Sequence, residues 1–396
     1  MSLHLAFGLL ILLFWLRRLR GARRGADSLA AAPDAPGAVS SWPHVTLLVA
    51  AKDEEAVIDA CLESLLRQDY PRFDVIAVDD RSSDRTFERL ERAAARQPDK
   101  LRALRIGELP PGWAGKPHAL ARGVLQARGE WLLFTDADCR FAPEALRVSM
   151  GTALARRAEL LSAMPRLRAE AWWERALQPL CVAHLMAWSR PHRAADARSS
   201  AAYANGQLIL AERGCYDALG GHAAVRAELN EDLALARRAK QAGRRLLVID
   251  GSAWLETRMY DSFARLCRGW SRQFYGCLAT PGRVALALVV GLLLALAPAA
   301  GLMLTARAVA AQGFDLAGVT ALGLWALALV VQHLAAAGLY ARLGVGRAWA
   351  LALLPAALFV AALLGSAWFK AAGLARTTWR GTVYRAGAAT GSAPRA

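Results

Sequence analysis

The sequence predicts an α/β domain with a mainly parallel sheet, accompanied by apolar helices at both ends of the chain. Hydrophobic residues make up 55% of the 396 residues, and the mean hydropathy is +0.24. Because soluble domains contain roughly 45–50% apolar residues, part of this chain is expected to lie in lipid. The apolar residues gather near the two ends, whereas residues 42–283 alternate apolar runs with charged segments. That alternation is typical of a soluble α/β domain.

Charge and cysteine content exclude several classes of protein. The net charge is +16 and the isoelectric point is about 10.3, which argues against an acidic disordered chain and allows anionic lipid, phosphate-bearing ligands or nucleic acid as partners. No aromatic and basic recognition motif supports nucleic acid, and arginines beside membrane segments account for much of the excess. The six cysteines contain no C-x-x-C pair, which argues against a disulfide framework or a zinc ribbon.

The N-terminal apolar run predicts a membrane anchor. Leu3–Leu16 is almost entirely apolar, and five arginines follow it within eight residues. In a cleavable signal peptide the positive charge would precede the apolar run, so this order favours an anchor with its arginines in the cytoplasm. The run is short for a full span, which leaves an interfacial anchor as the alternative. Residues 25–41 are rich in Ala, Pro, Gly and Ser and are expected to be a linker.

Three further segments, Val284–Ala306, Leu316–Tyr340 and Trp349–Phe369, are long enough to cross about 30 Å of hydrocarbon. Four crossings that start outside would leave the basic tail outside, against the positive-inside rule. We therefore favour a cytoplasmic tail, with one segment re-entrant or interfacial and Pro298 or Pro355 as a break point. The expected location is the inner cell membrane, with several crossings and a cytoplasmic catalytic domain.

The central domain is expected to bring carboxylates to one edge of its sheet. Strands are predicted at His44–Ala51, Phe73–Val78, Leu101–Ile106 and Trp131–Thr135, with helices at Ala56–Arg67 and Thr86–Arg96. Acidic residues follow three of these strands: Asp53, then Asp79 and Asp80, then Asp136 and Asp138. Ligands of parallel sheets bind beyond the carboxyl ends of the strands, so the joint placement of these residues predicts a binding site.

The Asp136-Ala137-Asp138 sequence suits a divalent cation. Mg²⁺ and Mn²⁺ prefer oxygen ligands, and Mg²⁺ often takes only one or two carboxylates together with substrate phosphates. Such an ion would neutralise the charge that develops on a departing diphosphate. Alternate residues of a strand point to opposite faces, so Asp138 is the expected direct ligand, with Asp136 toward the ribose or behind the ligand shell.

A second acidic pair, Glu231-Asp232, precedes a helix predicted at Leu233–Ala242. These acids could merely complement the helix N-terminus, or one of them could act as a general base. Upstream, Asn205-Gly206-Gln207 precedes a short apolar run.

Four stretches resemble family 2 glycosyltransferases, inverting enzymes with the GT-A (Rossmann-like) nucleotide-sugar fold: VTLLVAAKDEE (45–55), VIAVDDRSSDRT (75–86), GEWLLFTDADCRF (129–141) and NEDLALARRAKQAG (230–243). They occur in the family's order and spacing. Three shorter stretches are similar to membrane-bound hopanoid-associated and carotenoid glycosyltransferases and, more distantly, to ceramide glucosyltransferases: LPPGWAGKPHAL (109–120), WWERAL (172–177) and TTWRGTVYR (377–385).

The resemblance implies roles for the matching residues. Asp53 and Asp80 would contact the uracil and ribose of a sugar nucleotide, and Asp79 and Asp84 are weaker candidates for the same pocket. Asp138 would hold the metal, and Asp232 would be the catalytic base, with Glu231 as its substitute. Lys116 is expected to contact phosphate, which its charge also favours; a solvated loop lysine is the alternative.

One motif departs from the family pattern. The membrane synthases of the family carry Gln-x-x-Arg-Trp, whereas this chain has Arg265-Leu266-Cys267-Arg268-Gly269-Trp270, with arginine for glutamine and the tryptophan displaced by one. Arg268 would stabilise the leaving diphosphate, and Arg265 and Trp270 would lie at the acceptor or the membrane interface. An amphipathic interfacial helix uses the same residue types, so both interpretations stay open. The departure argues against a processive polysaccharide synthase.

Together these observations predict a hexosyltransferase that makes a single inverting transfer from a nucleoside-diphosphate sugar, with UDP favoured, to a polyprenyl, carotenoid, hopanoid or sphingoid lipid. The alternatives are a processive polysaccharide synthase and a nucleotidyltransferase acting on a lipid phosphate. A transporter would leave the acidic strand ends unexplained, and few polar residues lie in the apolar segments. The expected parts are an anchor (1–24), the linker (25–41), the catalytic domain ending in an interfacial helix (42–283), membrane helices (284–369) and a basic tail (370–396).

Overall fold

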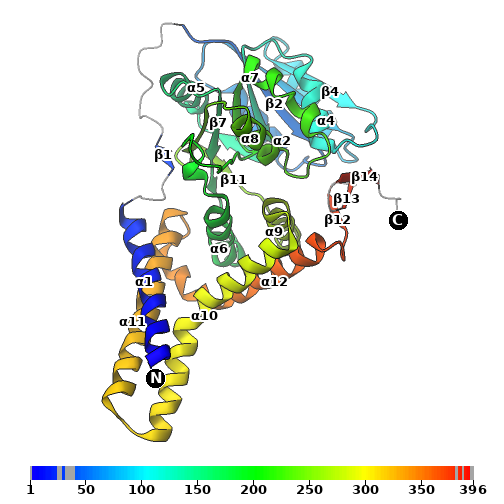
Figure 1. Cartoon of the computed structure of the whole chain (residues 1–396). Helices are drawn as coiled ribbons and strands as arrows, with labels where there is room; N and C mark the ends of the chain where they lie inside the picture. Colours follow the sequence, from blue (N-terminus) through cyan, green and yellow to red (C-terminus); the bar gives the residue numbers. More distant parts are fainter. Residues whose placement is uncertain (1, 25–28, 32–40, 380–381, 386–387, 393–396) are drawn as a thin grey trace. The chain divides into compact units, whose positions relative to one another are not determined.

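The computed structural model describes residues 2–24, 29–31, 41–379, 382–385 and 388–392 (Figure 1). Most of the expected linker, 25–41, lies outside the described residues. By its contacts the chain divides into two compact units. The helical unit comprises residues 1–28, 169–188 and 260–372, and the sheet unit comprises residues 29–168, 189–259 and 373–396. Each unit is described by itself.

The sheet unit is built on an eight-stranded sheet with the order β1-β10-β7-β9-β5-β2-β3-β4. Strand β9 runs antiparallel to β5 and β7, and every other neighbouring pair is parallel. The mainly parallel sheet is therefore confirmed. The strands are β1 (Ala30–Ala31), β2 (Val45–Ala51), β3 (Phe73–Asp80), β4 (Leu101–Ile106), β5 (Trp131–Asp136), β7 (Leu160–Met164), β9 (Ile209–Glu212) and β10 (Leu246–Asp250).

Helices cover the sheet because its central strands are apolar on both faces, as buried parallel strands usually are. In β3, Val75 and Ala77 join the core that contains Leu62 of α2, whereas Ile76 and Val78 join a second core with Ala119 of α4. This alternation is the two-residue period of a strand. The helices of this unit are α2 (Ile58–Leu66), α3 (Thr86–Arg96), α4 (Gly115–Val124), α5 (Ala145–Ala155), α7 (Arg213–Ala218) and α8 (Glu231–Gln241), with short 3-10 helices η1 (Pro191–Arg193) and η2 (Gly221–Val225).

Strand register aligns the acidic strand ends. Ala51 of β2 pairs with Asp79 of β3, and Ala50 pairs with Asp136 of β5. The loops after β2, β3 and β5 therefore leave the sheet at one edge. A second, three-stranded sheet contains β6 (Cys139–Phe141), β11 (Leu255–Thr257) and β8 (Arg166–Leu167). In this sheet β11 pairs antiparallel with β6 and parallel with β8. The described part of the C-terminal tail forms β12 (Thr377–Trp379), β13 (Thr382–Arg385) and β14 (Ala388–Ser392).

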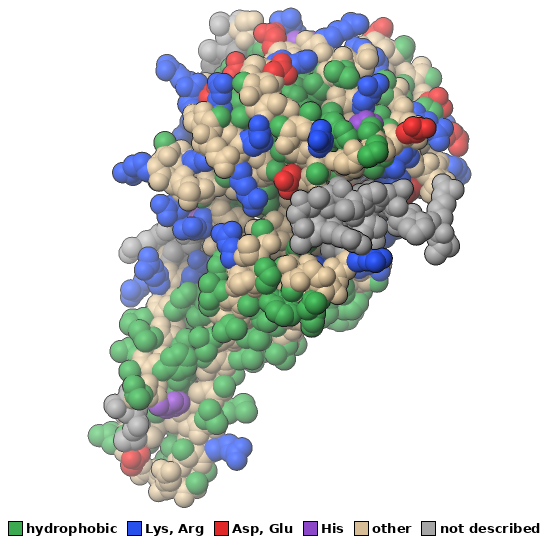
Figure 2. Space-filling view, turned by 45° about the vertical axis from the view of Figure 1, so that its right-hand side comes forward, with side chains coloured by type: hydrophobic (Ala, Val, Ile, Leu, Met, Phe, Trp, Pro, Cys, Tyr) green, Lys and Arg blue, Asp and Glu red, His purple; other side chains and the backbone are tan. Residues whose placement is uncertain are grey.

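The helical unit contains the apolar segments. Its elements are α1 (Ser2–Arg24), α6 (Trp172–Ser189), α9 (Phe263–Leu278), α10 (Pro281–Gln312), α11 (Leu316–Arg342), η3 (Arg347–Ala352) and α12 (Leu353–Ala371). Three stretches are long and apolar enough to cross a membrane by length and composition, namely 281–312, 316–342 and 347–371. Figure 2 shows hydrophobic side chains over much of the face that this unit presents. Helix α6, which falls within the expected catalytic segment, packs in this unit instead.

Neither proline named as a break point ends a helix. α10 continues through Pro298 and is bent along its length (Figure 1). A proline inside a helix removes one hydrogen bond and kinks the chain without necessarily ending it. Pro355 lies in the first turn of α12, where the missing N–H costs little. The expected interruption at Pro298 is therefore wrong, whereas in the third segment the 3-10 helix η3 gives way to α12 two residues before Pro355.

Gly129 fixes the register of β2 and β5, because a Cβ there would overlap backbone atoms of Thr46 and Trp131. Its N–H also donates to Thr46 Oγ1 at 2.9 Å. We expect Gly129→Ala to lower the free energy of unfolding by about 1–3 kcal/mol, the usual cost of overpacking, as measured by thermal unfolding of the purified chain. Gly107→Ala is the matched control, since a Cβ at Gly107 meets no atom within 4 Å. Equal losses in the two variants would contradict this account.

Candidate active site

Lys116 connects two acidic loops at the carboxyl edge of the sheet. Its Nζ lies 2.6 Å from Asp136 Oδ1 and 2.6 Å from Glu231 Oε1. Lys116 stands in the first turn of α4, Asp136 ends β5, and Glu231 begins α8. The Asp-x-Asp sequence, the Gly-Lys turn and the Glu-Asp pair therefore meet in one cluster, which we call the Lys116 cluster.

The lysine stays charged in this cluster. Burial by itself would lower the pKa of Lys116, but the carboxylates of Asp136, Glu231 and Asp232 raise it well above its usual value. The ammonium thus supplies a fixed positive charge beside three acidic side chains. Such a charge suits the binding of a diphosphate.

Asp232 is held by two backbone amides. The N–H of Gly206 donates to Asp232 Oδ2 at 2.9 Å, and the N–H of Leu233 donates to Oδ1 at 2.7 Å. Burial, and then the charge of Glu231, raise the pKa of Asp232 to about 7, although Lys116 and the two amides oppose the rise. A carboxylate with a pKa near neutrality is suited to accept a proton at physiological pH.

Gly206 leaves the room that this arrangement needs. A Cβ at this position would lie 2.6 Å from Lys116 Nζ and 3.5 Å from Asp232 Oδ2. A side chain would therefore displace the ammonium from its carboxylates. The Asn-Gly-Gln sequence by itself assigns Gly206 no role. Only its position just before an apolar run, upstream of the Glu-Asp pair, could have indicated one.

Asp138 lies in a strongly negative environment. Burial, followed by the charges of Asp136 and Glu54, raises the pKa of Asp138 to about 7, and the Cys139 thiol donates to its Oδ1 at 3.7 Å. Within the described residues Asp138 forms no ion pair, and no group of three or more His, Cys, Asp or Glu side chains is arranged to hold a metal ion. The side chains that act on Asp138 are carboxylates, whose oxygens are hard ligands. They fit a divalent ion that takes its remaining ligands from substrate phosphates.

The residues expected to bind the nucleotide line the loops after β2 and β3. Asp80 accepts two hydrogen bonds from Arg81, at 2.8 Å from Nε and 3.2 Å from Nη2. Asp53 Oδ1 accepts from the N–H of Ser83 at 2.7 Å. Asp53 and Arg81 both have positive φ angles, of 53° and 57°. Non-glycine residues rarely adopt this conformation, and it often marks functional loops.

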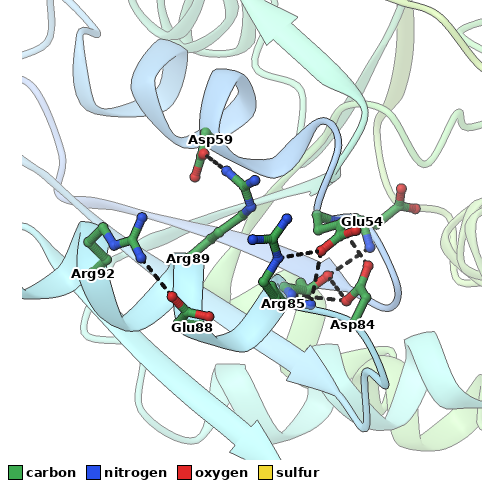
Figure 3. Close-up of polar contacts among 9 residues, drawn as sticks. Glu54, Asp59, Asp84, Arg85, Glu88, Arg89 and Arg92 are labelled. Atoms are coloured by element: carbon green, nitrogen blue, oxygen red, sulfur yellow. Dashed lines mark hydrogen bonds and ion pairs between the residues drawn. The ribbon is translucent and has the colours of Figure 1, made fainter.

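Asp79 and Asp84 hold these loops together from within. Asp79 is fully buried, accepts from the N–H of Ser82 at 3.3 Å, and has a pKa raised mainly by burial. Asp84 accepts from the N–H groups of Thr86 at 2.9 Å and Glu55 at 3.1 Å. Figure 3 shows Asp84 and Arg85 beside the loop that contains Glu54. Both aspartates thus have structural partners in the sheet unit, and their contact with a nucleotide stays a prediction.

Gly115 brings α4 against the nucleotide loop. A Cβ at this position would overlap the carboxylate of Asp80. The helix that carries Lys116 can therefore begin beside Asp80 only because residue 115 has no side chain. Gly115 thus brings the backbone close to Asp80, and the next residue, Lys116, carries the positive charge of the cluster.

The residues expected to contact the leaving diphosphate or the acceptor all lie on α9 in the helical unit. They are Arg265, Arg268 and Trp270. Arg268 is exposed, and Arg265 is paired with Asp261 at 3.0 Å. Trp270 is buried against Phe274, with ring centroids 5.8 Å apart. Their roles in acceptor or diphosphate binding stay predictions.

Comparison with known proteins identifies the class of enzyme. A family model described as "Glycosyltransferase like family 2" matches residues 43–276, more than half of the chain. The protein is therefore a glycosyltransferase. It belongs to glycosyltransferase family 2, as the four sequence stretches indicated.

The chain is similar to several characterised proteins. It is 26% identical over 271 residues to 4,4'-diaponeurosporenoate glycosyltransferase of Staphylococcus aureus (strain MRSA252), covering 66% of this chain and 69% of the relative. Over 108 residues it is 39% identical to beta-monoglucosyldiacylglycerol synthase of Synechocystis sp., covering 27% of this chain and 22% of the relative. Among solved structures, a Pyrobaculum calidifontis mannosyltransferase in complex with GDP-Man and Mn²⁺ matches at 22% identity, covering 90% of this chain and 96% of that one, with a TM-score of 0.47.

Lys116→Met is expected to destabilise the protein, because it leaves Asp136 and Glu231 facing each other without a cation. With its side chain 28% exposed, the loss should be about 2 kcal/mol, between the values for buried and surface pairs. The loss should be larger at mildly alkaline than at mildly acidic pH, since the neighbouring Asp232, whose pKa is about 7, is ionised on the alkaline side and adds to the unbalanced negative charge. Chemical denaturation at the two pH values measures it.

The control is Lys100→Met, which removes a lysine whose ammonium lies over the ring of Phe73, 5.2 Å from the ring centroid. It should cost about 0.5 kcal/mol or less. A Lys116→Met variant as stable as wild type at both pH values would show that the cluster contributes nothing to folding.

Proposed function

We propose that this glycosyltransferase makes a single inverting transfer of a sugar from a nucleoside-diphosphate sugar, with UDP favoured, to a membrane lipid. The observation that supports this best is the Lys116 cluster. It places a carboxyl group with a pKa of about 7 beside a permanent positive charge and the Asp-x-Asp sequence.

Asp232 serves as the general base. Its carboxylate takes the proton of an acceptor hydroxyl as the hydroxyl oxygen bonds to the anomeric carbon of the sugar. The bond between that carbon and the diphosphate oxygen breaks on the opposite face, which inverts the anomeric configuration. The two backbone amides from Gly206 and Leu233 aim the carboxylate. A carboxylate acceptor would already be ionised and would need little help from the base.

Lys116 stabilises the departing diphosphate. Its ammonium trades part of its contact with Asp136 and Glu231 for the phosphate oxygens, where negative charge grows as the bond breaks. Preorganised charge of this kind usually contributes more to enzymatic rate enhancement than any other effect. A divalent cation held by Asp138, with Asp136 beside it, would supply further neutralisation of the phosphates. Arg268 is the second candidate for a protein cation at the diphosphate.

The nucleotide is proposed to lie along the loops after β2 and β3. Asp53 and Asp80 are the expected contacts to uracil and ribose. Their carboxylates are already oriented by Ser83 and Arg81, so a nucleotide could bind without large rearrangement of the loops.

A lipid acceptor is favoured by two facts. Three stretches of the chain could cross a membrane, and by their names one relative glycosylates diaponeurosporenoate and another makes beta-monoglucosyldiacylglycerol. A soluble acceptor would not require a catalytic domain associated with such helices. We propose that the catalytic domain faces the cytoplasm, where the positive-inside rule places the arginines that follow the first apolar run.

A processive polysaccharide synthase and a lipid-phosphate nucleotidyltransferase are the alternatives. Membranes containing the protein are incubated with Mn²⁺, a panel of sugar nucleotides and a lipid extract, and the products are analysed. We expect nucleoside diphosphate to be released with one donor, only when lipid is present, together with a lipid that carries one sugar. Inorganic diphosphate with nucleotide in the lipid would indicate the nucleotidyltransferase, and a growing polymer would indicate the synthase. NMR of the anomeric proton tests inversion.

The second test is the pH dependence of kcat/KM. A base with a pKa of about 7 is protonated below that pH, so the rate should fall by about tenfold per pH unit on the acid side and level off above neutrality. Asp232→Asn should lower kcat by about 10²–10⁴ while donor binding persists. The matched control is Asp217→Asn, which removes an exposed carboxylate paired with Arg213 at 3.2 Å. Activity retained in Asp232→Asn but lost in Glu231→Gln would assign the base to Glu231.

A further inference from the structure

Three helices of the helical unit lie side by side in alternating directions. His4 of α1 is hydrogen-bonded to Thr305 of α10 at 2.8 Å and to Trp325 of α11 at 2.9 Å. Trp15, three turns further along α1, donates to Leu294 O of α10 at 3.2 Å. Gln332 of α11 also donates to Leu294 O, at 3.0 Å. Helices α1 and α11 therefore run in the same direction, and α10 runs in the opposite direction (Figure 1).

This arrangement gathers positive charge at one end of the three helices. Beyond Trp15 on α1, before Leu294 on α10 and beyond Gln332 on α11, the described residues include Arg17, Arg18, Arg20, Arg283, Arg342 and Arg347. Toward the other end stand Arg307 and Asp315. We call the first end the arginine end. Between the two ends, α10 exposes large apolar side chains such as Leu293, Met303 and Leu304.

The chain supplies few acids to neutralise this charge. From residue 262 to the C-terminus the sequence contains twelve lysines and arginines but one acidic residue, Asp315. The acids of this segment are therefore too few to neutralise its own basic residues. Anionic lipid headgroups attract each nearby basic residue by about 1 kcal/mol.

One lysine in this region has a defined set of partners. Lys370 Nζ, at the end of α12, donates to Ser271 Oγ of α9 at 2.7 Å, and that hydroxyl donates to Ser366 Oγ at 2.9 Å. The side chain of Ser271 is buried. The charge of the neighbouring Arg272 acts on Lys370. In the part of the chain that the structure describes, no carboxylate contacts Lys370. Helix α9 leads directly into α10, near Arg283 of the arginine end.

We propose that Lys370, Arg272 and Ser271 form a binding site for the phosphate of an anionic membrane lipid. Two cations that repel each other lie beside Ser271, whose hydroxyl holds the Lys370 ammonium in place. A phosphate oxygen can accept hydrogen bonds from the ammonium and from the Arg272 guanidinium. Arginine and lysine bind phosphate through short, charge-assisted hydrogen bonds. The exposed apolar side chains of the adjoining helices would contact the acyl chains. The occupant is a phospholipid of the cytoplasmic leaflet.

Phosphatidylglycerol is the probe, and the full chain in detergent is titrated with it by native mass spectrometry, with phosphatidylcholine as the zwitterionic reference. We expect wild type to prefer phosphatidylglycerol. Lys370→Met should weaken its binding by about fivefold, the equivalent of one basic residue near a charged surface, and should leave phosphatidylcholine binding unchanged. Lys370→Arg should restore the preference.

Arg307→Gln is the matched control, because it removes one exposed positive charge from the opposite end of the same unit. It should bind phosphatidylglycerol as wild type does. If Lys370→Met does not fold, as judged by thermal unfolding, Ser271→Ala tests the same site and should also weaken binding. Equal affinity of wild type for the two lipids, or undiminished binding by the variants, would overturn the proposal. Displacement of the lipid by millimolar inorganic phosphate would show a site for free anions instead. The measurement needs no sugar donor, so it stands apart from the proposed transfer reaction.

Discussion

The architecture of the candidate active site depends on one ammonium group shared by two carboxylates. Lys116 lies 2.6 Å from both Asp136 and Glu231, which come from separate segments of the sheet unit. Without a cation, three acidic side chains could not share a half-buried space, since like charges close together disfavour ionisation. The same charge limits how far the pKa of Asp232 rises. One ion-pair network thus holds the site together and also influences the protonation of the proposed base. A change in the geometry of this network would therefore also change the pKa of Asp232.

Glycines make this network possible, for steric reasons. Gly115 lets α4 begin against Asp80, Gly206 leaves room for the ammonium, and Gly129 lets a loop approach the backbone of β2. At each of these positions a side chain would occupy space that a polar group or a neighbouring strand now fills. The parallel register then brings the loops to one edge, because Ala51 pairs with Asp79 and Ala50 with Asp136. Precise positioning in this protein therefore depends on side chains that are missing as much as on those present.

Much of the fold could be predicted because its signals are local. The apolar runs of β2, β3, β4 and β5 and the acids at their ends are contiguous in sequence, and their alternation with helices implies a parallel sheet. The pairing of Lys116 with Glu231 could not be predicted, since the two residues are more than a hundred positions apart and each has a plausible role alone. The assignment of α6 to the helical unit was missed for a similar reason. Its composition fits a core helix of either unit, and only its packing, such as the hydrogen bond from Tyr340 to Ala176 O at 2.7 Å, decides.

Charge is distributed so that the two units need different partners. Within the sheet unit the acids at the sheet edge meet Lys116, Arg81 and other cations, so the unit largely neutralises its own charge and leaves a small set of groups for phosphate and sugar. Beyond residue 261 a single acid accompanies twelve basic residues, so the acids of this segment are too few to balance its own positive charge. A chain that held this much positive charge in a lipid environment without external anions would incur a large electrostatic cost. The imbalance is therefore best explained as a requirement for anionic headgroups, which would hold the enzyme at the surface where a lipid acceptor is found.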